Sequence, residues 1–235
     1  AGTSLTVPTA LDIWEGDEKN PGAILLSFID GDTATAESVT EDLPYQMGKL
    51  LGELHSVPMP GFGHDSKHGF LYVENNDWWN FIWTKLGQIS ASSTPHLPTD
   101  TVRKMNDFFQ AFRKNPPPVD GPCVVHADYR PGNILVKDGK ITGLIDFESG
   151  RGGSADFDFS KIKLYVWDNA PGTRKPFEDG YKSIRPLPSL SRLLDFNALF
   201  HALNHIDWCV KRGTTQNEQF LRENVSIVEK IAKAL

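Results

Sequence analysis

The feature that constrains this chain most is the pair Asp138-Gly139, which lies between two apolar runs rich in β-branched residues. Asp-Gly in this setting favours a β-hairpin closed by a two-residue type I′ turn. With that turn, Asn133 faces Leu144 and Asp146 lies one pair beyond, at the open end of the hairpin. Because side chains alternate along a strand, Asn133, Leu144 and Asp146 are expected on one face.

A polar loop turned by Pro131-Gly132 leads into this hairpin and brings Asp128 to its open end. Diagonal neighbours on one face of a strand pair lie roughly 7–8 Å apart at the backbone. The amide oxygen of Asn133 and the carboxylate of Asp146 can therefore reach one small cation. Carboxylate and amide oxygens are hard ligands of the kind that Mg²⁺ takes alongside phosphates. The sequence thus predicts a magnesium site beside Asp128.

One ordered set of residues carries a resemblance to known enzymes. In chain order it reads His126-x-Asp128-x-x-x-x-Asn133 and then, after the hairpin, Ile145-Asp146-Phe147. This spacing resembles the catalytic loop and metal-binding segment shared by protein kinases and aminoglycoside phosphotransferases. Ala127 and Glu148 stand where protein kinases have Arg and Gly, so the stretch is similar to the antibiotic and small-molecule branch. The resemblance implies an α+β, protein-kinase-like fold with a mainly helical carboxy-terminal lobe.

The resemblance also implies roles for the central residues. Asp128 would hydrogen-bond an acceptor hydroxyl and receive its proton, while Asn133 and Asp146 would hold Mg²⁺ across the phosphates of ATP or GTP. Arg130 stands where protein kinases place a lysine near the transferred phosphoryl, and its guanidinium could offset charge there. A surface ion pair is an equally weighted interpretation of Arg130.

Four further residues are implicated as support or as acceptor contacts. His126 is implied as structural support, and Asp158 matches the aspartate of the family segment ending in Tyr-Asp-Leu-Ala, which braces the catalytic loop. Glu148 and Asp156 follow the metal segment and could bind amines of an acceptor. They could equally be solvated loop acids.

The beginning of the chain is similar to the end of a kinase amino-terminal lobe. Two strands are expected over 4–15 and 23–29, and Ser27 and Ile29 are candidates to bind the nucleotide base through their backbones. An ordinary strand ending at a glycine turn is the alternative. We therefore divide the chain into a lobe remnant with hinge, 1–31, and a helical lobe, 32–235. The family's glycine-rich hairpin and strand lysine are not found upstream, so either the chain is a fragment, which we favour, or the nucleotide clamp is reduced.

The remaining chain is expected to be mainly helical. The predicted elements are a helix from Glu41 or Asp42 to about Ser56, an aromatic stretch over 70–89, a loop over 90–98, a helix from Thr99 or Asp100 to Asn115, a loop over 174–190, and helices over 191–212 and 217–235. The aromatic stretch could wall an acceptor pocket, but core packing is favoured. His201 and His205 have the spacing of a metal pair, yet partnered helix histidines are favoured.

Composition narrows the class of protein. A net charge of −6 argues against a nucleic-acid partner and suits a cationic ligand. Two cysteines are too few for a disulfide framework, which favours a reducing, cytoplasmic setting. No apolar run approaches the roughly 20 residues that span a membrane. The oligomeric state is not indicated.

The function expected from these observations is phosphoryl transfer from ATP or GTP to a hydroxyl of a small molecule. The acidic character favours a cationic acceptor of the aminoglycoside type, which would make the protein an antibiotic-resistance kinase, whereas the aromatic stretch favours a macrolide. Choline, homoserine and sugars are other acceptors that the resemblance allows. A non-catalytic, kinase-like binding module and a metal-dependent hydrolase are the alternatives from other classes.

Overall fold

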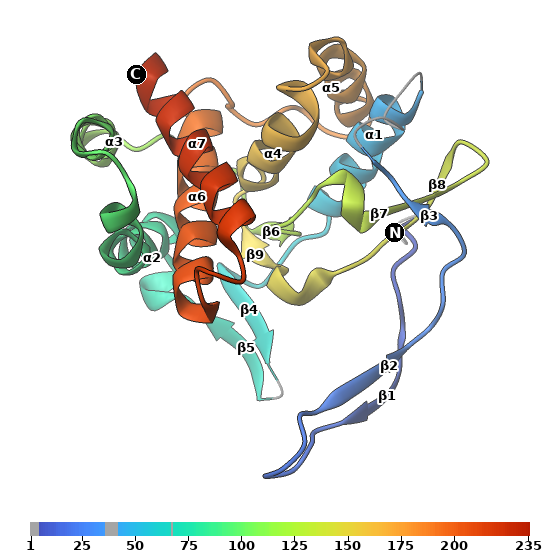
Figure 1. Ribbon diagram of the computed structural model, residues 1–235. Coiled ribbons are helices and arrows are strands. Elements are labelled where there is room, and N and C mark those ends of the chain that lie inside the picture. The colour runs from blue at the N-terminus through green and yellow to red at the C-terminus, as the bar shows by residue number, and fades with distance from the viewer. Residues whose placement is uncertain (1–4, 36–41, 67) are drawn as a thin grey trace. The chain divides into compact units, whose positions relative to one another are not determined.

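The computed structural model describes residues 5–35, 42–66 and 68–235 of the chain (Figure 1). The chain divides into two compact units that alternate along the sequence. The first unit comprises 1–57, 126–150 and 164–187, and the second comprises 58–125, 151–163 and 188–235. Helices combined with small sheets confirm the expected α+β class. The boundary expected after residue 31 stays a prediction.

The predicted hairpin lies in the first unit. Strands β7 (Ile134–Lys137) and β8 (Lys140–Leu144) pair antiparallel, and β3 (Asp32–Thr33) pairs with the other edge of β7. Asp138 and Gly139 have φ angles of 50° and 72°. Positive φ at both central residues is what a type I′ turn requires. The predicted turn is therefore confirmed.

The register of the hairpin differs from the prediction by one residue. A bulge leaves Thr142 as an extra residue in β8, so Leu144 pairs with Ile134 and not with Asn133. A bulge places two residues of one strand opposite one of its partner and shifts all pairs beyond it. Asn133 ends a 3₁₀ turn before β7, and its carbonyl oxygen accepts a hydrogen bond from the Ile145 N–H at 2.9 Å.

Helix α1 (Leu43–His55) is tied to the hairpin by one amide side chain. Nε2 of Gln46 donates to Oδ2 of Asp42 at 3.2 Å and to the carbonyl oxygen of Gly139 at 3.0 Å. Its Oε1 accepts from the N–H of Ile141 at 3.1 Å. Asp42 occupies the N-cap position of α1, but its carboxylate binds this amide and no backbone N–H of the first turn. Glu41 lies outside the described residues.

Helix α5 (Arg174–Lys182) occupies a stretch where the sequence predicted a loop. Pro176 lies in its first turn, where the missing N–H breaks no intrahelical hydrogen bond. The helix packs on α1 at very short range, since a Cβ built on Gly48 would lie 1.9 Å from the carbonyl oxygen of Phe177. The loop prediction is wrong for 174–182, because packing on α1 stabilises this short helix, whereas 183–190 lies outside helices and strands as predicted.

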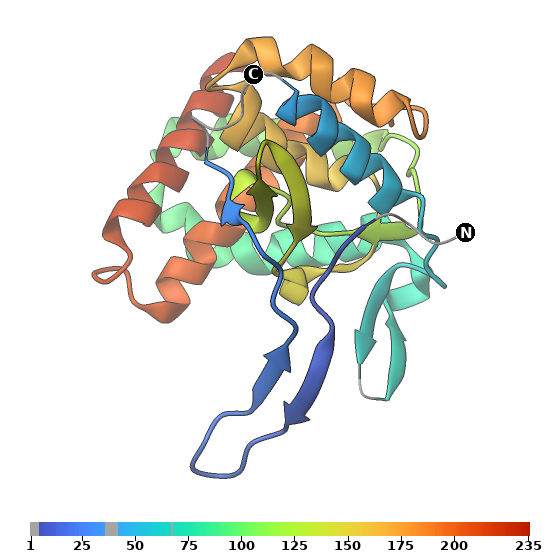
Figure 2. The ribbon, with the colours of Figure 1, turned by 90° about the vertical axis from the view of Figure 1, so that its right-hand side faces the viewer.

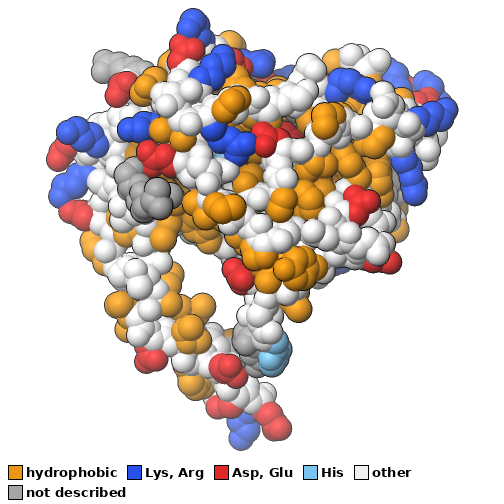
Figure 3. All heavy atoms as spheres, turned by 180° about the vertical axis from the view of Figure 1, so that it is seen from behind, with side chains coloured by type: hydrophobic (Ala, Val, Ile, Leu, Met, Phe, Trp, Pro, Cys, Tyr) orange, Lys and Arg blue, Asp and Glu red, His pale blue; other side chains and the backbone are white. Residues whose placement is uncertain are grey.

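Strands β1 (Ala10–Trp14) and β2 (Ala23–Leu26) form a separate antiparallel pair, as predicted (Figure 2). Every residue of both strands is exposed. Apolar side chains cover this hairpin, which lies at the lower left of Figure 3. The larger ones, together with Phe28 just beyond β2, are Leu11, Ile13, Trp14, Ile24, Leu25 and Leu26.

The second unit combines a four-stranded sheet with five helices. The strand order is β5 (Gly69–Tyr72), β4 (Gly63–Ser66), β9 (Arg151–Gly153) and β6 (Cys123–Val125). The helices are α2 (Trp78–Ser93), α3 (Thr99–Lys114), α4 (Asp156–Ile162), α6 (Leu193–Arg212) and α7 (Glu218–Ala234). Helix α6 is mostly buried and packs against α2, α4 and α7.

The structure corrects the loop predicted over 90–98 and shows how the aromatic stretch packs. Helix α2 continues to Ser93 and a 3₁₀ turn follows, so the predicted loop over 90–98 is mostly helical. In the aromatic stretch, Trp78 is 3% exposed, and Trp79 packs edge-on against Phe196 of α6 at 5.5 Å between ring centroids. Core packing is therefore confirmed for these tryptophans.

In the described parts of the chain, no helix is long and apolar enough to cross a membrane.

Candidate active site

His126 connects the catalytic loop to the end of β8. The ring is fully buried, and its Nδ1 lies 3.2 Å from the N–H of Asp128. Because a backbone N–H can only donate, Nδ1 is the acceptor and the ring proton is on Nε2. Nε2 then donates to the carbonyl oxygen of Ile145 at 2.9 Å. Ala127 between them has a φ of 63°, a left-handed conformation that turns the chain sharply.

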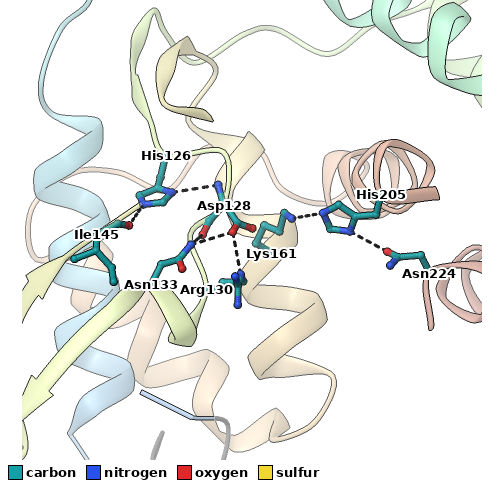
Figure 4. Close-up of polar contacts among 8 residues, drawn as sticks. All are labelled: His126, Asp128, Arg130, Asn133, Ile145, Lys161, His205 and Asn224. Atoms are coloured by element: carbon teal, nitrogen blue, oxygen red, sulfur yellow. Dashed lines mark hydrogen bonds and ion pairs between the residues drawn. The ribbon is translucent and has the colours of Figure 1, made fainter. Parts of the chain in front are cut away.

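Asp128 is the centre of a compact polar cluster (Figure 4). Its Oδ2 accepts from Nε of Arg130 at 2.9 Å and from Nδ2 of Asn133 at 2.9 Å. The Asn133 amide also donates to the backbone carbonyl of Asp128 at 2.9 Å. The Asp128 side chain keeps 24% of its surface exposed, so its carboxylate can meet a ligand from solvent.

Arg130 makes its ion pair with the candidate base and not with a remote surface acid. Partial burial lowers the pKa of the guanidinium, but the hydrogen bond and charge of Asp128 outweigh burial and the pKa is raised. Tyr165 and Asp146 also contribute to raising the pKa of Arg130. The group is therefore a permanent cation beside the base.

Asp146 lies at the same end of the hairpin. It has a φ of 69° and is exposed, and its charge acts on Arg130. The preceding residue, Ile145, donates its N–H to the Asn133 carbonyl. The structure thus brings Asp128, Arg130 and Asn133 into direct contact and places Asp146 beside them.

The donor set suits a magnesium ion that is shared with nucleotide phosphates. Both hydrogens of the Asn133 amide face Asp128, which directs Oδ1 away from that carboxylate. Oδ1 of Asn133 and the exposed carboxylate of Asp146 are the oxygen ligands that this chain would supply. Within the described ranges, no group of three or more His, Cys, Asp or Glu side chains is arranged to hold a metal. Mg²⁺ commonly uses only one or two carboxylates and completes its shell with waters and phosphates.

The two candidate acceptor acids differ in their surroundings. Glu148 is exposed, two residues after Asp146. Asp156 is only 3% exposed, and its carboxylate accepts hydrogen bonds from Ser154 and from Nδ2 of Asn197. Burial raises the pKa of Asp156, and these two hydrogen bonds oppose that rise. The interior position corrects the expectation that Asp156 binds an acceptor: its carboxylate joins the start of α4 to α6.

Three other predicted residues have less direct evidence. Asp158 is fully buried in the first turn of α4, and its bracing of the catalytic loop stays a prediction. At the hinge candidate, the Ser27 N–H donates to the Thr9 carbonyl at 2.8 Å, and the Ser27 hydroxyl accepts from the Thr9 N–H at 2.8 Å. Ile29 packs against β8, where Gly143 leaves space for it. Base binding by these backbones stays a prediction.

A buried polar series in the second unit was not predicted from the sequence (Figure 4). Lys161, only 2% exposed, lies 2.9 Å from Nε2 of His205, and Nδ1 of His205 lies 2.9 Å from Oδ1 of Asn224. Nδ2 of Asn224 donates to the Phe220 carbonyl, so Oδ1 is the acceptor and Nδ1 of His205 carries a proton. His205 is thus a partnered helix histidine, as favoured. No local signal marks Lys161 or Asn224, which lie far apart in the sequence.

A pocket of about 210 Å³ lies elsewhere in the first unit, between α1 and β8. Its lining includes Lys49, Glu53 and Thr142, but none of the predicted site residues. This pocket is therefore not part of the candidate site, which is defined by the polar cluster around Asp128.

Comparison with known proteins decides the family. Residues 1–193 match the phosphotransferase enzyme family. The chain belongs to this family. A homoserine kinase of Gluconobacter oxydans is 28% identical over 176 residues, which cover 70% of this chain and 51% of that protein. The chain spans about half the length of the curated relatives it matches.

Solved structures of phosphotransferases show the same fold. A thermostable mutant of aminoglycoside phosphotransferase APH(4)-Ia, in ternary complex with ADP and hygromycin B, matches with a TM-score of 0.72 at 18% identity, covering 99% of this chain and 78% of that one. The GDP complex of wild-type aminoglycoside 2'-phosphotransferase-IIIa matches with a TM-score of 0.69 at 14% identity, covering 99% and 77%. These similarities confirm the expected kinase-like fold.

Proposed function

We propose that this phosphotransferase moves the terminal phosphoryl of ATP or GTP to a hydroxyl of a small molecule, with an aminoglycoside-type antibiotic as the first candidate acceptor. The observation that carries the proposal is the contact of Asp128 with both Arg130 and Asn133, beside Asp146. Membership of the phosphotransferase enzyme family supports it, as do structural neighbours that bind ADP or GDP. We place the activity in the cytoplasm, where these nucleotides are available.

Asp128 binds the acceptor hydroxyl and receives its proton late in the transfer. Its carboxylate is partly exposed, and the bonds from Arg130 and Asn133 both go to Oδ2. A carboxylate that is partly exposed can reach an acceptor hydroxyl that enters from solvent. Phosphoryl transfer has a loose transition state, in which positioning and charge stabilisation matter more than proton removal. The first task of Asp128 is accordingly to orient the hydroxyl.

Arg130 places positive charge where the phosphoryl leaves the nucleotide. Nε is bound to Asp128, and 38% of the side-chain surface is exposed, so the terminal nitrogens can donate to phosphoryl oxygens. Asn133 and Asp146 would hold Mg²⁺ together with the phosphates. When bound, the ion neutralises charge that develops on the β- and γ-phosphate oxygens.

Two acceptor classes have specific support. A neighbour of similar fold binds hygromycin B, and the exposed Glu148 together with the net charge of −6 suits a cationic aminoglycoside. Homoserine is the second candidate, because the curated relatives that match over most of this chain are homoserine kinases. Homoserine also offers one amine and one hydroxyl, although it carries a carboxylate as well.

The experiment is a transfer assay on the longest native chain. ATP or GTP is supplied with Mg²⁺ and with hygromycin B, kanamycin, homoserine or choline, and nucleotide diphosphate and phosphorylated product are both measured. Asp128→Asn is expected to lower turnover by about a thousandfold with folding retained. Asp138→Asn is the matched control, since Asp138 lies exposed in the hairpin turn and Asn tolerates its positive φ.

The alternatives give different results in the same assay. Phosphate release that needs no acceptor would identify a hydrolase. Nucleotide binding without turnover on any acceptor would identify a binding module. Turnover unchanged by Asp128→Asn would remove the proposed mechanism.

A further inference from the structure

The guanidinium of Arg130 is held by more than its ion pair with Asp128. Its Cζ lies 6.0 Å from the centroid of the Tyr165 ring, over the ring face. It also fills the space beside Gly132, because a Cβ built there would lie 2.7 Å from NH1 of Arg130. Nε binds Oδ2 of Asp128 at 2.9 Å. The Asp128 carboxylate, the Tyr165 ring face and the backbone at Gly132 thus limit the positions that the guanidinium can occupy.

Tyr165 lies in an unusual backbone element. Residues Lys163–Trp167 form a π-helix, and such segments are rare and occur often at functional sites. The negative face of an aromatic ring attracts a guanidinium within about 6 Å of its centroid. Arg side chains stack well on such faces because the guanidinium is planar and weakly hydrated. The contact with Arg130 is therefore attractive as well as close.

We propose that Tyr165 is a positioning residue for phosphoryl transfer, which acts by holding the Arg130 guanidinium beside Asp128 in the plane that directs its outer nitrogens to the phosphoryl group. Gly132 belongs to the same arrangement, since a Cβ at this position would displace NH1 of Arg130. The inference rests on the proposed function, because the charge that Tyr165 positions serves the transfer.

A double-mutant cycle tests whether Tyr165 acts through Arg130. Tyr165→Leu removes the ring and Tyr165→Phe keeps it, and each is made in the native chain and in Arg130→Gln. In the native background, Tyr165→Leu is expected to lower kcat about tenfold with little change in KM for the nucleotide, and Tyr165→Phe to retain activity within about twofold. In the Arg130→Gln background both substitutions should have no further effect. The proposal would be overturned if Tyr165→Leu lowered kcat equally in the native chain and in Arg130→Gln. It would also be overturned if Tyr165→Leu left the kcat of an active native chain unchanged.

Gly132→Ala is a second variant that leaves Tyr165 intact. The added methyl should displace NH1 of Arg130 and lower kcat, again only when Arg130 is present. Gly172→Ala is its matched control, because Gly172 also follows a proline at the start of a 3₁₀ turn and has no atom within 4 Å of a built Cβ. If Gly132→Ala and Gly172→Ala behave alike, the space beside Gly132 has no role in positioning Arg130.

A measurement without turnover separates this proposal from the proposed function. The ¹⁵N signal of the Arg130 Nε–H is recorded in the unliganded chain and in both Tyr165 variants. We expect a shift and faster solvent exchange in Tyr165→Leu and little change in Tyr165→Phe. An unchanged signal in Tyr165→Leu would refute the positioning role even if the chain transfers phosphoryl. If the signal shifts in Tyr165→Leu but the chain has no transferase activity, Tyr165 does hold Arg130, and only the role of this contact in phosphoryl transfer is refuted.

Discussion

Asn133 donates both hydrogens of its amide to a single residue, Asp128. Nδ2 lies 2.9 Å from the backbone carbonyl oxygen and 2.9 Å from Oδ2 of the carboxylate. One side chain therefore fixes the backbone and the carboxylate of the candidate base together. The same amide presents its oxygen as a ligand for Mg²⁺, so the geometry of the base and the affinity for metal depend on one residue.

Asn133→Ala should impair both tasks. Asn133 is 3% exposed, and its loss leaves the Asp128 carbonyl without this donor, at a cost of about 1–3 kcal/mol in the free energy of unfolding. The Mg²⁺ concentration for half-maximal turnover should rise by about tenfold or more, since one of two protein ligands is lost. Titration of turnover with Mg²⁺ and thermal unfolding measure the two effects. A variant that unfolds more easily but needs no more Mg²⁺ would exclude Asn133 as a ligand.

Asn133→Asp separates the two tasks by its pH dependence. It keeps an oxygen ligand but places a second carboxylate beside Asp128. Two like charges in one site raise one of the two pKa values. The pair of carboxylates would then hold one proton up to a higher pH, and the acid side of the pH–rate profile should move to higher pH than in the native chain. An identical acid limb would show that residue 133 does not face Asp128 in the working enzyme.

Asp156 should make folding stability depend on pH. Burial raises its folded-state pKa above the ordinary value of 3.8, despite hydrogen bonds from Ser154 and Asn197. A raised carboxyl pKa leaves stability intact below the unfolded-state pKa and removes it as pH rises through the folded-state pKa. Asp156→Asn abolishes this loss, so the melting temperature of the variant should rise relative to that of the native chain as pH increases above the ordinary carboxyl value of 3.8. A difference that stays constant with pH would show that Asp156 does not titrate as its burial implies.

The contact between α6 and α7 should depend on Asn224. Asn224→Ala removes the acceptor for Nδ1–H of His205 inside the second unit, and one unsatisfied buried donor costs about 1–3 kcal/mol in the free energy of unfolding. Gln219→Ala, on the exposed side of the same helix, is the control and should stay within about 0.5 kcal/mol of the native chain. Denaturant unfolding compares the two. Equal effects would mean that the polar series is not a stabilising contact.

Two glycines with open surroundings should respond to alanine in opposite directions. Neither Gly139 nor Gly87 has an atom within 4 Å of a built Cβ. Gly139 has a φ of 72° in the hairpin turn, so Gly139→Ala should destabilise by about 1–2 kcal/mol through backbone strain alone. Gly87 lies exposed within α2, and Gly87→Ala should stabilise by about 0.5–1 kcal/mol by reducing the entropy of the unfolded chain. A stabilising Gly139→Ala would contradict the type I′ turn.

The predictions that succeeded depend on local signals. The hairpin turn follows from Asp138-Gly139, whose positive φ angles are favoured by those two residue types. The contacts of Asp128 with Arg130 and Asn133 are also local, since Asp128 and Asn133 are five positions apart, but the roles predicted for these residues stay predictions. Long amphipathic helices such as α6 and α7 were predicted for a similar reason, since apolar residues recur at helical spacing.

The sequence by itself thus indicated the phosphotransferase family, the turn that shapes the hairpin and the positions of the long helices. Tertiary structure alone decided the bulge at Thr142, the helical state of α5, the burial of Asp156 and the contact of Tyr165 with Arg130. Each of the last three depends on partners more than 30 positions away in the chain. Such contacts are stabilised by packing and desolvation, and these appear only when distant segments are brought together.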